Sequence, residues 1–415
     1  MSEALDTTAA QSLGQLNPAD PQRFANETVL PVFEQLRAQD PVHLTPDSKY
    51  GPYWSITRYE DIMAVDKNNQ AFSSSAHLGG ILIDDDIFGD PESEFFISSF
   101  IAMDQPYHGQ QRKAVSDIVR PDSLRNFESL IRGRVQATLD SLPIGEPFDW
   151  VDNVSIELTT KMLATLFDFP FEERRKLTRW SDVATAEEGS PLVDGQEGRI
   201  RELFECLEYF KKLRAERKDR TDSFDLLTML AQDPATKDQD DGQFLGTLLL
   251  LIVGGNDTTR NTMSASINAF NQFPEQLALL KAQPNLLSSA ISEIIRWQTP
   301  LAHMRRTALQ DVTVGGKHIK KGDKVVMWYY SGNRDTAVFE NPNAIDIQRK
   351  NVRQHIAFGF GIHRCLGLRL AELQLKVLWE EILQRWDRIE IVEPPERVLS
   401  NFVNGYSKMM VTIHE

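Results

Sequence analysis

The clearest chemical signature in the sequence surrounds Cys365. Residues 358–367 read F-G-F-G-I-H-R-C-L-G, and a regular apolar pattern follows from Leu366 to Trp386, which predicts an amphipathic helix. A cysteine at the N-terminal end of a helix lies in the positive end of the helix dipole, which favours thiolate over thiol. The glycines around it leave room for a flat, bulky group beside the backbone. A lone cysteine is more often an inert buried side chain, but a thiolate beside a planar group suggests an axial ligand of haem iron.

A second candidate site interrupts an apolar helix. The apolar run 248–253 is followed by G-G-N-D-T-T at residues 254–259. Glycine costs a helix about 1 kcal/mol relative to alanine, and threonine hydroxyls compete for backbone carbonyls. Such a break in a buried helix indicates a functional site. A glycine-weakened helix packed on a neighbour is the simpler alternative.

Two further pairs have helical spacing. His108 and Arg112 are four residues apart, so on a helix they share one face. Two such donors suit a bidentate anion, although alone the pair is typical of an ordinary protein surface. Glu293 and Arg296 form an i, i+3 pair, which is common and contributes little by itself.

Composition restricts the class of protein. The 415 residues are 41% hydrophobic, enough for a large core in one domain or two. The formal net charge of −15 argues against nucleic acid as a partner. Two widely separated cysteines suit a reducing cytoplasm rather than a disulfide framework. The N-terminus lacks the features of a signal peptide, and the longest apolar run, 244–253, is too short to span a membrane. We therefore expect a cytoplasmic protein without a membrane span.

The apolar periodicity predicts a chain that is mostly helical. Residues 1–28 are expected to form a flexible N-terminal arm, and the acidic run 84–86 to lie in a solvated loop. Helices are predicted at 29–39, 59–67, 123–140, 155–166, 171–182 and 199–220, and strands at 42–44, 53–57, within 312–328, 389–392 and 409–413.

These motifs resemble those of the cytochrome P450 monooxygenases. They occur in the same order as in that family, and the resemblance covers essentially the whole chain. Residues 358–367 resemble the F-x-x-G-x-x-x-C-x-G haem-binding loop of that family, and residues 254–258 resemble its [A/G]-G-x-D-T signature. The pairs at 108/112 and 293/296 resemble its H-x-x-x-R and E-x-x-R motifs. The resemblance implies a mainly α fold, a helix-rich triangular prism with small β-sheets. It implies a single haem-thiolate domain over residues 1–415, with haem b between the helix around residue 248 and the cysteine helix.

The resemblance also assigns roles to residues. Cys365 is expected to ligate the iron, Thr258 to hydrogen-bond bound dioxygen, and Asp257 to relay protons from solvent. Glu293, Arg296 and Arg349 are expected to form a buried polar network. This network would hold residues 358–367, here called the cysteine loop, in place. The other implied haem contacts are His108, Arg112, Arg306 (in preference to Arg305), His363, Phe358, Gly361 and Gly255. The implied pocket wall is Ile81, Leu82, Ile83, Leu250, Val253, Gly254, Leu301, Ala302, Phe402 and Val403.

Within the family, segments 163–170, 251–260, 292–300, 326–335 and 371–380 resemble the bacterial terminal (omega) hydroxylases of medium-chain alkanes and fatty acids. This implies insertion of one atom of O2 into a C–H bond, with electrons from a separate iron–sulfur ferredoxin and its NAD(P)H-dependent reductase. Four alternatives stay open: a monooxygenase of a terpenoid or aromatic compound, a haem peroxygenase, a haem-thiolate gas sensor, and a haem-free helical binding protein. The sequence leaves the chain length, the choice between alkane and acid, the ferredoxin and the oligomeric state undetermined.

Overall fold

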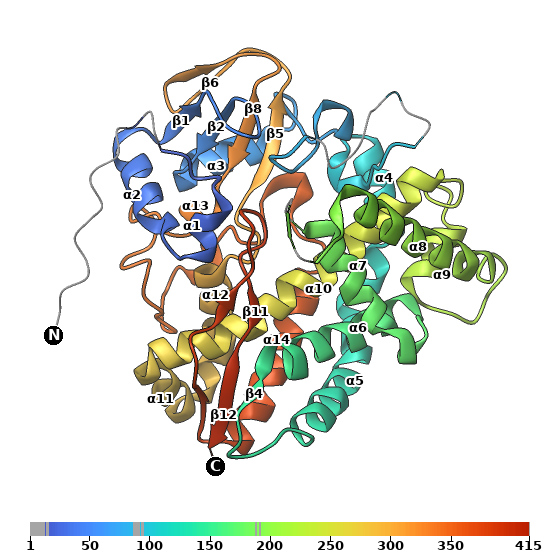
Figure 1. The fold of residues 1–415 in the computed structure, drawn as a ribbon, viewed down its shortest axis with the longest axis vertical. Helices are drawn as coiled ribbons and strands as arrows, with labels where there is room; N and C mark the ends of the chain where they lie inside the picture. Colours follow the sequence, from blue (N-terminus) through green and yellow to red (C-terminus); the bar gives the residue numbers. More distant parts are fainter. Residues whose placement is uncertain are drawn as a thin grey trace.

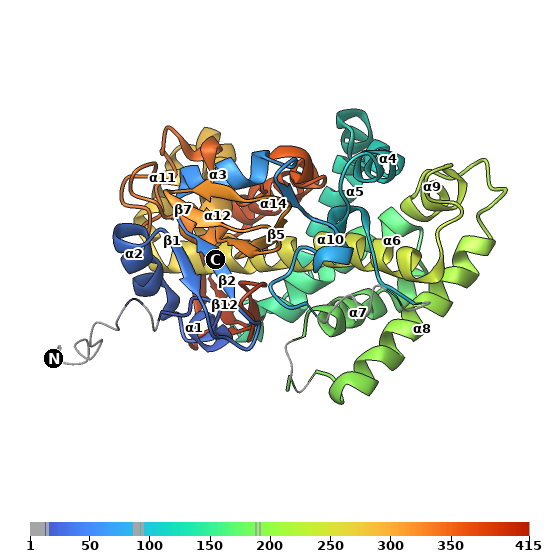
Figure 2. The same cartoon turned by 90° about the horizontal axis from the view of Figure 1, so that it is seen from above.

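A computed structural model describes residues 13, 16–85, 92, 95–186, 189–190 and 192–414. A sheet-rich region, formed by early and late parts of the chain, lies beside a larger helical region (Figure 1). The helix α10 (Asp241–Gln272) crosses the molecule and reaches both regions, as the view from above shows (Figure 2). The predicted mainly α architecture with small sheets is therefore confirmed.

Helices account for most of the regular structure. α10 is the longest of them, at 32 residues. The others are α1 (Pro21–Ala25), α2 (Val29–Gln39), α3 (Tyr59–Lys67), α4 (Tyr107–Ala114), α5 (Pro121–Leu139), α6 (Glu157–Phe167), α7 (Arg175–Thr185), α8 (Gly195–Ala215), α9 (Leu226–Gln232), α11 (Pro274–Ala282), α12 (Leu287–Gln298), α13 (Tyr329–Gly332) and α14 (Leu368–Arg385). None of the described helices combines the length and apolar character needed to cross a bilayer.

Small sheets occupy the other region. The largest described sheet has the strand order β1-β2-β8-β5-β3, in which β2 and β8 are parallel and the other pairs antiparallel. Three smaller sheets are β4-β12-β9, β10-β11 and β6-β7. The strands are β1 (Val42–Thr45), β2 (Tyr53–Ile56), β3 (Phe72–Ser73), β4 (Phe148–Asp149), β5 (Met304–Ala308), β6 (Val312–Val314), β7 (Lys317–Ile319), β8 (Lys324–Met327), β9 (Arg388–Ile391), β10 (Glu396–Arg397), β11 (Tyr406–Lys408) and β12 (Met410–His414).

The described part of the N-terminal segment is packed against the body of the protein. Leu16, Ala19 and Phe24 are buried. The ring of Phe24 stacks on Trp328, with centroids 6.1 Å apart, and the Asp20 side chain caps the start of α1. The expectation of a flexible arm over residues 1–28 is therefore wrong for residues 16–28, because apolar side chains anchor them. Residues 1–12, 14 and 15 lie outside the described part of the chain.

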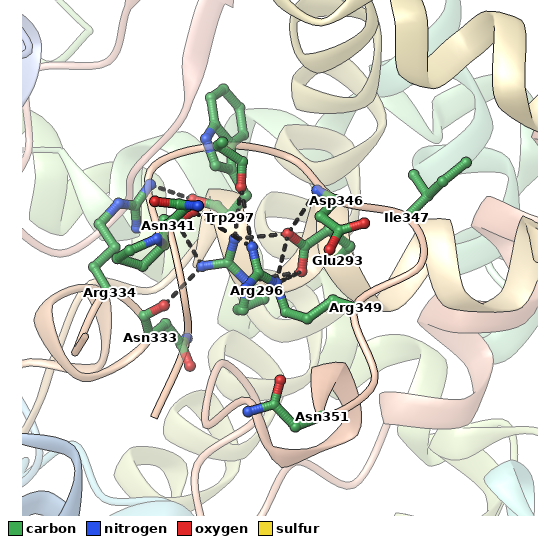
Figure 3. A network of polar contacts seen from close by, with 12 residues as sticks. Glu293, Arg296, Trp297, Asn333, Arg334, Asn341, Asp346, Ile347, Arg349 and Asn351 are labelled. Carbon is green, nitrogen blue, oxygen red and sulfur yellow. Dashed lines mark hydrogen bonds and ion pairs between the residues drawn. The ribbon is translucent and has the colours of Figure 1, made fainter. Parts of the chain in front are cut away.

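Glu293, Arg296 and Arg349 form a buried ionic network (Figure 3). Arg296 donates from Nε and Nη2 to the two carboxylate oxygens of Glu293, at 2.8 Å each. Arg349 Nε lies 3.0 Å from both of these oxygens. Glu293 and Arg296 are both 0% exposed. The structure thus brings together the three residues that the sequence grouped.

The network holds the segment that precedes the cysteine loop. Arg296 Nη1 donates to the carbonyls of Asn333 and Pro342, at 2.8 Å each. Asn333 in turn accepts the amide hydrogen of Ile356 on its Oδ1, at 2.8 Å. Because Ile356 lies two residues before Phe358, these hydrogen bonds link the network to the cysteine loop through Asn333.

We predict that Glu293→Gln strongly destabilises the protein. The change leaves Arg296 and Arg349 buried without a counter-charge, and breaking a buried ion pair from one side costs about 3–5 kcal/mol. Chemical denaturation should show a loss of this order in the free energy of unfolding. The exposed Glu393 provides the control, since Glu393→Gln should change stability by less than about 0.5 kcal/mol. Equal stability of the two variants would contradict a supporting role for the network.

Candidate active site

A cavity of about 510 Å³ lies between α10 and the residues that precede α14, and Cys365 is on its wall. Side chains from α4, α6, α8, α10 and β5 complete it. Many of the residues selected from the sequence meet here. Those on the wall are Cys365, Thr258, Phe358, His363, His108, Arg112, Arg306, Gly254, Gly255, Ile81, Leu82, Leu250, Val253, Leu301 and Phe402.

Three residues predicted for the pocket wall face away from it. Ile83 and Ala302 pack instead into the core beside α1 and β8, and Val403 is buried in a backbone bridge with Leu301. Successive side chains of an extended segment point to opposite sides. For this reason Leu301 and Phe402 reach the cavity while their neighbours Ala302 and Val403 do not.

Much of the apolar wall was not identified from the sequence. It comes from the segment before α4 and from one face each of α6 and α8. On a helix, side chains that line a cavity have the same spacing as side chains that line a core, so periodicity does not separate the two. The additional wall residues are Phe95, Ile97, Ile101, Met162, Leu163, Leu166, Ile200, Leu203 and Phe204.

The cysteine loop is fixed against α3. Gly361 has φ +68°, and a Cβ there would lie 2.6 Å from the carbonyl oxygen of Asp66. The Phe360 amide donates to Asp66 Oδ2 at 2.8 Å, and the Cys365 amide donates to the Phe358 carbonyl at 2.8 Å. Gly361 is absent from the cavity wall. The close approach of α3 requires glycine at this position, and its role as a haem contact stays a prediction.

The surroundings of Cys365 act on its pKa in opposite directions. Burial raises the pKa of the thiol, and the Gly367 and Leu368 amides, with Arg112 and Arg364, lower it by less. A metal ion bound to the sulfur removes its proton outright, so iron bound there would hold the sulfur as a thiolate.

Four donor side chains, those of His108, His363, Arg112 and Arg306, gather at one edge of the cavity, here called the cationic edge. The rings of His108 and His363 lie 4.2 Å apart, beside Arg112 and Arg306. Burial, together with the arginines, lowers the pKa of His108 to about 4 and also lowers that of His363. His108 Nε2 and His363 Nδ1 are buried and without hydrogen-bond partners among the described residues. Arg306 forms an ion pair with the carboxylate of Asp66 at 2.8 Å. Arg112 has no carboxylate partner among the described residues.

These features fit haem. Two arginines and two unpartnered histidine nitrogens line this edge, and Arg112 has no described carboxylate partner. The two haem propionates are carboxylates of the kind that arginine binds. The iron needs an axial ligand, and Cys365 is on the same cavity wall. The donor set therefore matches both the charged edge and the metal of this cofactor.

The two glycines of α10 have different surroundings. A Cβ at Gly255 would lie 2.7 Å from Leu163 Cδ2 of α6, whereas a Cβ at Gly254 would meet nothing within 4 Å. Gly255 thus allows close packing of the two helices, and Gly254 leaves open space in the cavity. Thr258 Oγ1 donates to the Gly254 carbonyl at 2.9 Å, so its hydroxyl lies beside that space.

Asp257 points away from the cavity into a polar network with α7. Its carboxylate is 0% exposed and accepts from Ser181 Oγ at 2.9 Å and from Thr185 Oγ1 at 3.3 Å. Arg260 Nη2 lies 3.2 Å from Asp257 and 2.6 Å from Asp182. Sequence reasoning missed these partners because they belong to a helix more than 70 residues away.

Arg305 and Lys324, here called the cationic clamp, bind residues 78–85, the segment that carries Ile81 and Leu82. The guanidinium of Arg305 donates to the carbonyls of Leu78 and Gly79, at 3.0 and 3.1 Å, and to the Asp85 carboxylate. Lys324 Nζ donates to the same carboxylate at 2.6 Å. Asp85 is exposed in a loop, as expected for the run 84–86, and it also pairs with both cations. Residue 86 lies outside the described residues.

A mainly α fold with a cysteine and a cationic edge on one cavity defines a haem-thiolate monooxygenase. The comparisons with known proteins agree: the chain belongs to the cytochrome P450 family. The Cytochrome P450 family model matches residues 276–412. The linalool 8-monooxygenase of Pseudomonas putida is 34% identical over 403 residues, 95% of this chain and 98% of that protein. The steroid C26-monooxygenase of Mycolicibacterium smegmatis is 32% identical over 392 residues, 92% and 90% of the two chains.

Solved structures give the same result. The cytochrome P450-153 of Novosphingobium aromaticivorans superposes with a TM-score of 0.90 at 43% identity, covering 96% of this chain and 99% of that one. CYP153D17 from Sphingomonas sp. PAMC 26605 gives 0.90 at 46% identity, covering 97% and 100%. The fold is thus that of a cytochrome P450, and the cofactor is haem b with a cysteine thiolate as iron ligand.

We predict that Asp85→Asn loosens the clamp. Arg305 and Lys324 then lose the anion that they share, and segment 78–85 should exchange its amide hydrogens at least several-fold faster. Hydrogen exchange followed by mass spectrometry measures this directly. The exposed Asp47 serves as the matched control, and Asp47→Asn should leave that segment unchanged. Unaltered exchange in Asp85→Asn would show that the carboxylate is dispensable for holding the segment.

Proposed function

We propose that this monooxygenase hydroxylates the terminal carbon of a medium-chain alkane or fatty acid. The observation that carries the proposal is the apolar wall of the cavity that also holds Thr258; it includes Leu250, Val253, Leu301 and Phe402. Such a wall offers few hydrogen bonds to a substrate and suits an alkyl chain, for which each buried CH2 contributes about 0.8 kcal/mol. The resemblance of five sequence segments to terminal hydroxylases, and the similarity to two P450-153 structures, support the same class.

We assign the iron to Cys365 and the haem carboxylates to the cationic edge. Arg112 and Arg306 supply charge to the two propionates, and the ring nitrogens of His108 and His363 supply further hydrogen bonds. When bound there, haem supplies the activation of O2 and the transfer of one oxygen atom into a C–H bond, with the other leaving as water.

Proton delivery falls to Asp257 and Thr258. The buried carboxylate of Asp257 exchanges protons through the hydroxyls of Ser181 and Thr185, which it contacts on the α7 side. Rotation of the Thr258 side chain away from the Gly254 carbonyl presents its hydroxyl to the cavity. Together the acid and the alcohol can hold a proton and pass it inward.

Terminal selectivity has to come from positioning. A terminal C–H bond is stronger than the internal bonds beside it, so reactivity alone favours attack further along the chain. A narrow approach that admits only the methyl end reverses this preference. In this proposal Leu301 and Val253, both on the cavity wall, form that narrow approach.

A second candidate substrate is a branched isoprenoid. The relatives named for linalool C8 and steroid C26 oxidation are 34% and 32% identical to this chain. Both positions are terminal methyl carbons, so these names agree with terminal attack while leaving the chain type open. Comparison of a linear alkane or acid with linalool separates the two candidates.

The electron donor is, in this proposal, a separate iron–sulfur ferredoxin. Lys113, Arg353, Arg364 and Arg369 are exposed near the cysteine loop, on a chain whose net charge is −15. A local basic surface of this kind can steer an acidic protein toward the haem, with a rate that falls as salt rises. Arg353 also pairs with Glu372 at 2.6 Å, which reduces its share.

We predict that Cys365→His retains haem but loses the thiolate signature. Replacing sulfur with imidazole removes the electron donation that shifts the Soret band of the reduced carbon monoxide complex to longer wavelength. Absorbance of the reduced, CO-treated protein checks this. Cys206→Ala, which removes the other cysteine, should keep the shifted band. The assignment of Cys365 fails if its variant keeps the band too.

Product analysis tests the proposed function. With a surrogate ferredoxin and reductase, decanoate or octane should give mainly the terminal alcohol by gas chromatography. Leu301→Ala widens the passage and should lower the ratio of terminal to internal alcohol several-fold, whereas Val403→Ala, beside it but outside the cavity, should leave the ratio unchanged. Mainly internal alcohols from the unaltered protein would refute terminal hydroxylation, and turnover of bulky polycyclic compounds alone would refute the alkane or fatty-acid class.

A further inference from the structure

The charged groups on the described cavity wall are all basic. Arg112 and Arg306 lie at the edge assigned to the haem carboxylates, together with the two histidines. Arg199 of α8 is the remaining arginine, and the wall contains no described aspartate or glutamate. Arg199 is half-buried on this largely apolar wall, and its charge is not assigned to the haem carboxylates. It is therefore free to take part in binding an anionic ligand.

Arg199 lies where the cavity opens to solvent. The neighbouring wall residues Gln196, Ile200 and Phe204 are exposed, with 46% of Ile200 and 41% of Phe204 accessible. α8 lies on the outer side of α7, away from the sheet-rich region (Figure 2). Cys365, by contrast, is on the wall beside the start of α14. The two ends of the cavity thus differ: one holds the thiol and the other a guanidinium.

The guanidinium retains donors for a ligand. Arg199 Nη2 donates to the Ala186 carbonyl at the end of α7. Its Nε is buried and has no hydrogen-bond partner among the described residues. Arg199 forms no ion pair with a described carboxylate. Gln196, three residues earlier on α8 and also on the wall, offers an amide.

We propose that Arg199 binds the carboxylate of a fatty acid, so that the preferred substrate is an acid rather than an alkane. This rests on the proposed function, since it names the substrate class of the same site. The planar guanidinium matches a carboxylate, and a charge at the mouth avoids burial in the aliphatic part. Holding the carboxylate there leaves the methyl end directed toward the thiol end, as terminal hydroxylation requires.

Binding to the haem-loaded protein tests the proposal with decanoate and its uncharged methyl ester. Dissociation constants come from the haem spectral shift and from calorimetry. Arg199→Gln should weaken decanoate binding about tenfold, or about 1.4 kcal/mol, and change methyl ester binding less than twofold. Arg199→Lys should fall between, because it keeps the charge without the fork. Arg201→Gln, on the same helix but exposed and outside the cavity wall, should alter neither.

Each outcome decides the matter. If Arg199→Gln weakens both ligands equally, or neither, the carboxylate site is wrong and the arginine only secures Ala186. Terminal alcohol from methyl decanoate would then still support the proposed function. Conversely, selective loss of decanoate binding combined with internal alcohols would uphold the carboxylate site and refute terminal hydroxylation. A protein that binds neither compound overturns both proposals.

Discussion

The buried carboxylate of Asp66 is the contact on which the geometry of the pocket depends. Its Oδ1 accepts from Arg306 on β5 at 2.8 Å, and its Oδ2 accepts from the Tyr329 hydroxyl and the Phe360 amide, at 2.8 Å each. Burial, together with Asp66, raises the pKa of Tyr329 well above its usual value, so the phenol remains a donor. One side chain of α3 thereby fixes the cationic edge and the cysteine loop relative to each other. Without it, Arg306 would be buried with no carboxylate partner.

A second constraint couples the acid of α10 to the helices that cover the cavity. Asp257 and Asp182 share Arg260, and burial raises the pKa of Asp182 despite that arginine. Ser181 and Thr185 complete the contact from α7. Any displacement of α7 must therefore change the hydrogen bonds of Asp257.

The sequence predicted the elements and the motif residues well, because both depend on local pattern. The bounds of α2 and α3 agree with the predicted 29–39 and 59–67, and Glu293, Arg296 and Arg349 meet as expected. Residues without a local signal were missed. Asp66 resembles an ordinary helix acid, and its importance appears only when β5 and the cysteine loop approach it. The wall residues of α6 and α8 have the same spacing as helical core residues. Leu301 and Ala302 alternate in the same way as residues of any strand.

The same charges link folding to the cofactor. Without an anion, Arg112 lacks a described carboxylate partner, and two buried ring nitrogens lack hydrogen-bond partners, each a cost to the folded state. Burial also raises the pKa of the Cys365 thiol on the same wall. A cofactor with carboxylates and a metal ion would offer partners to these groups, and a ligand that binds only the folded state stabilises it in proportion to its affinity. The features that make this pocket unfavourable when empty are therefore those that make it specific for a dianionic, thiol-binding cofactor.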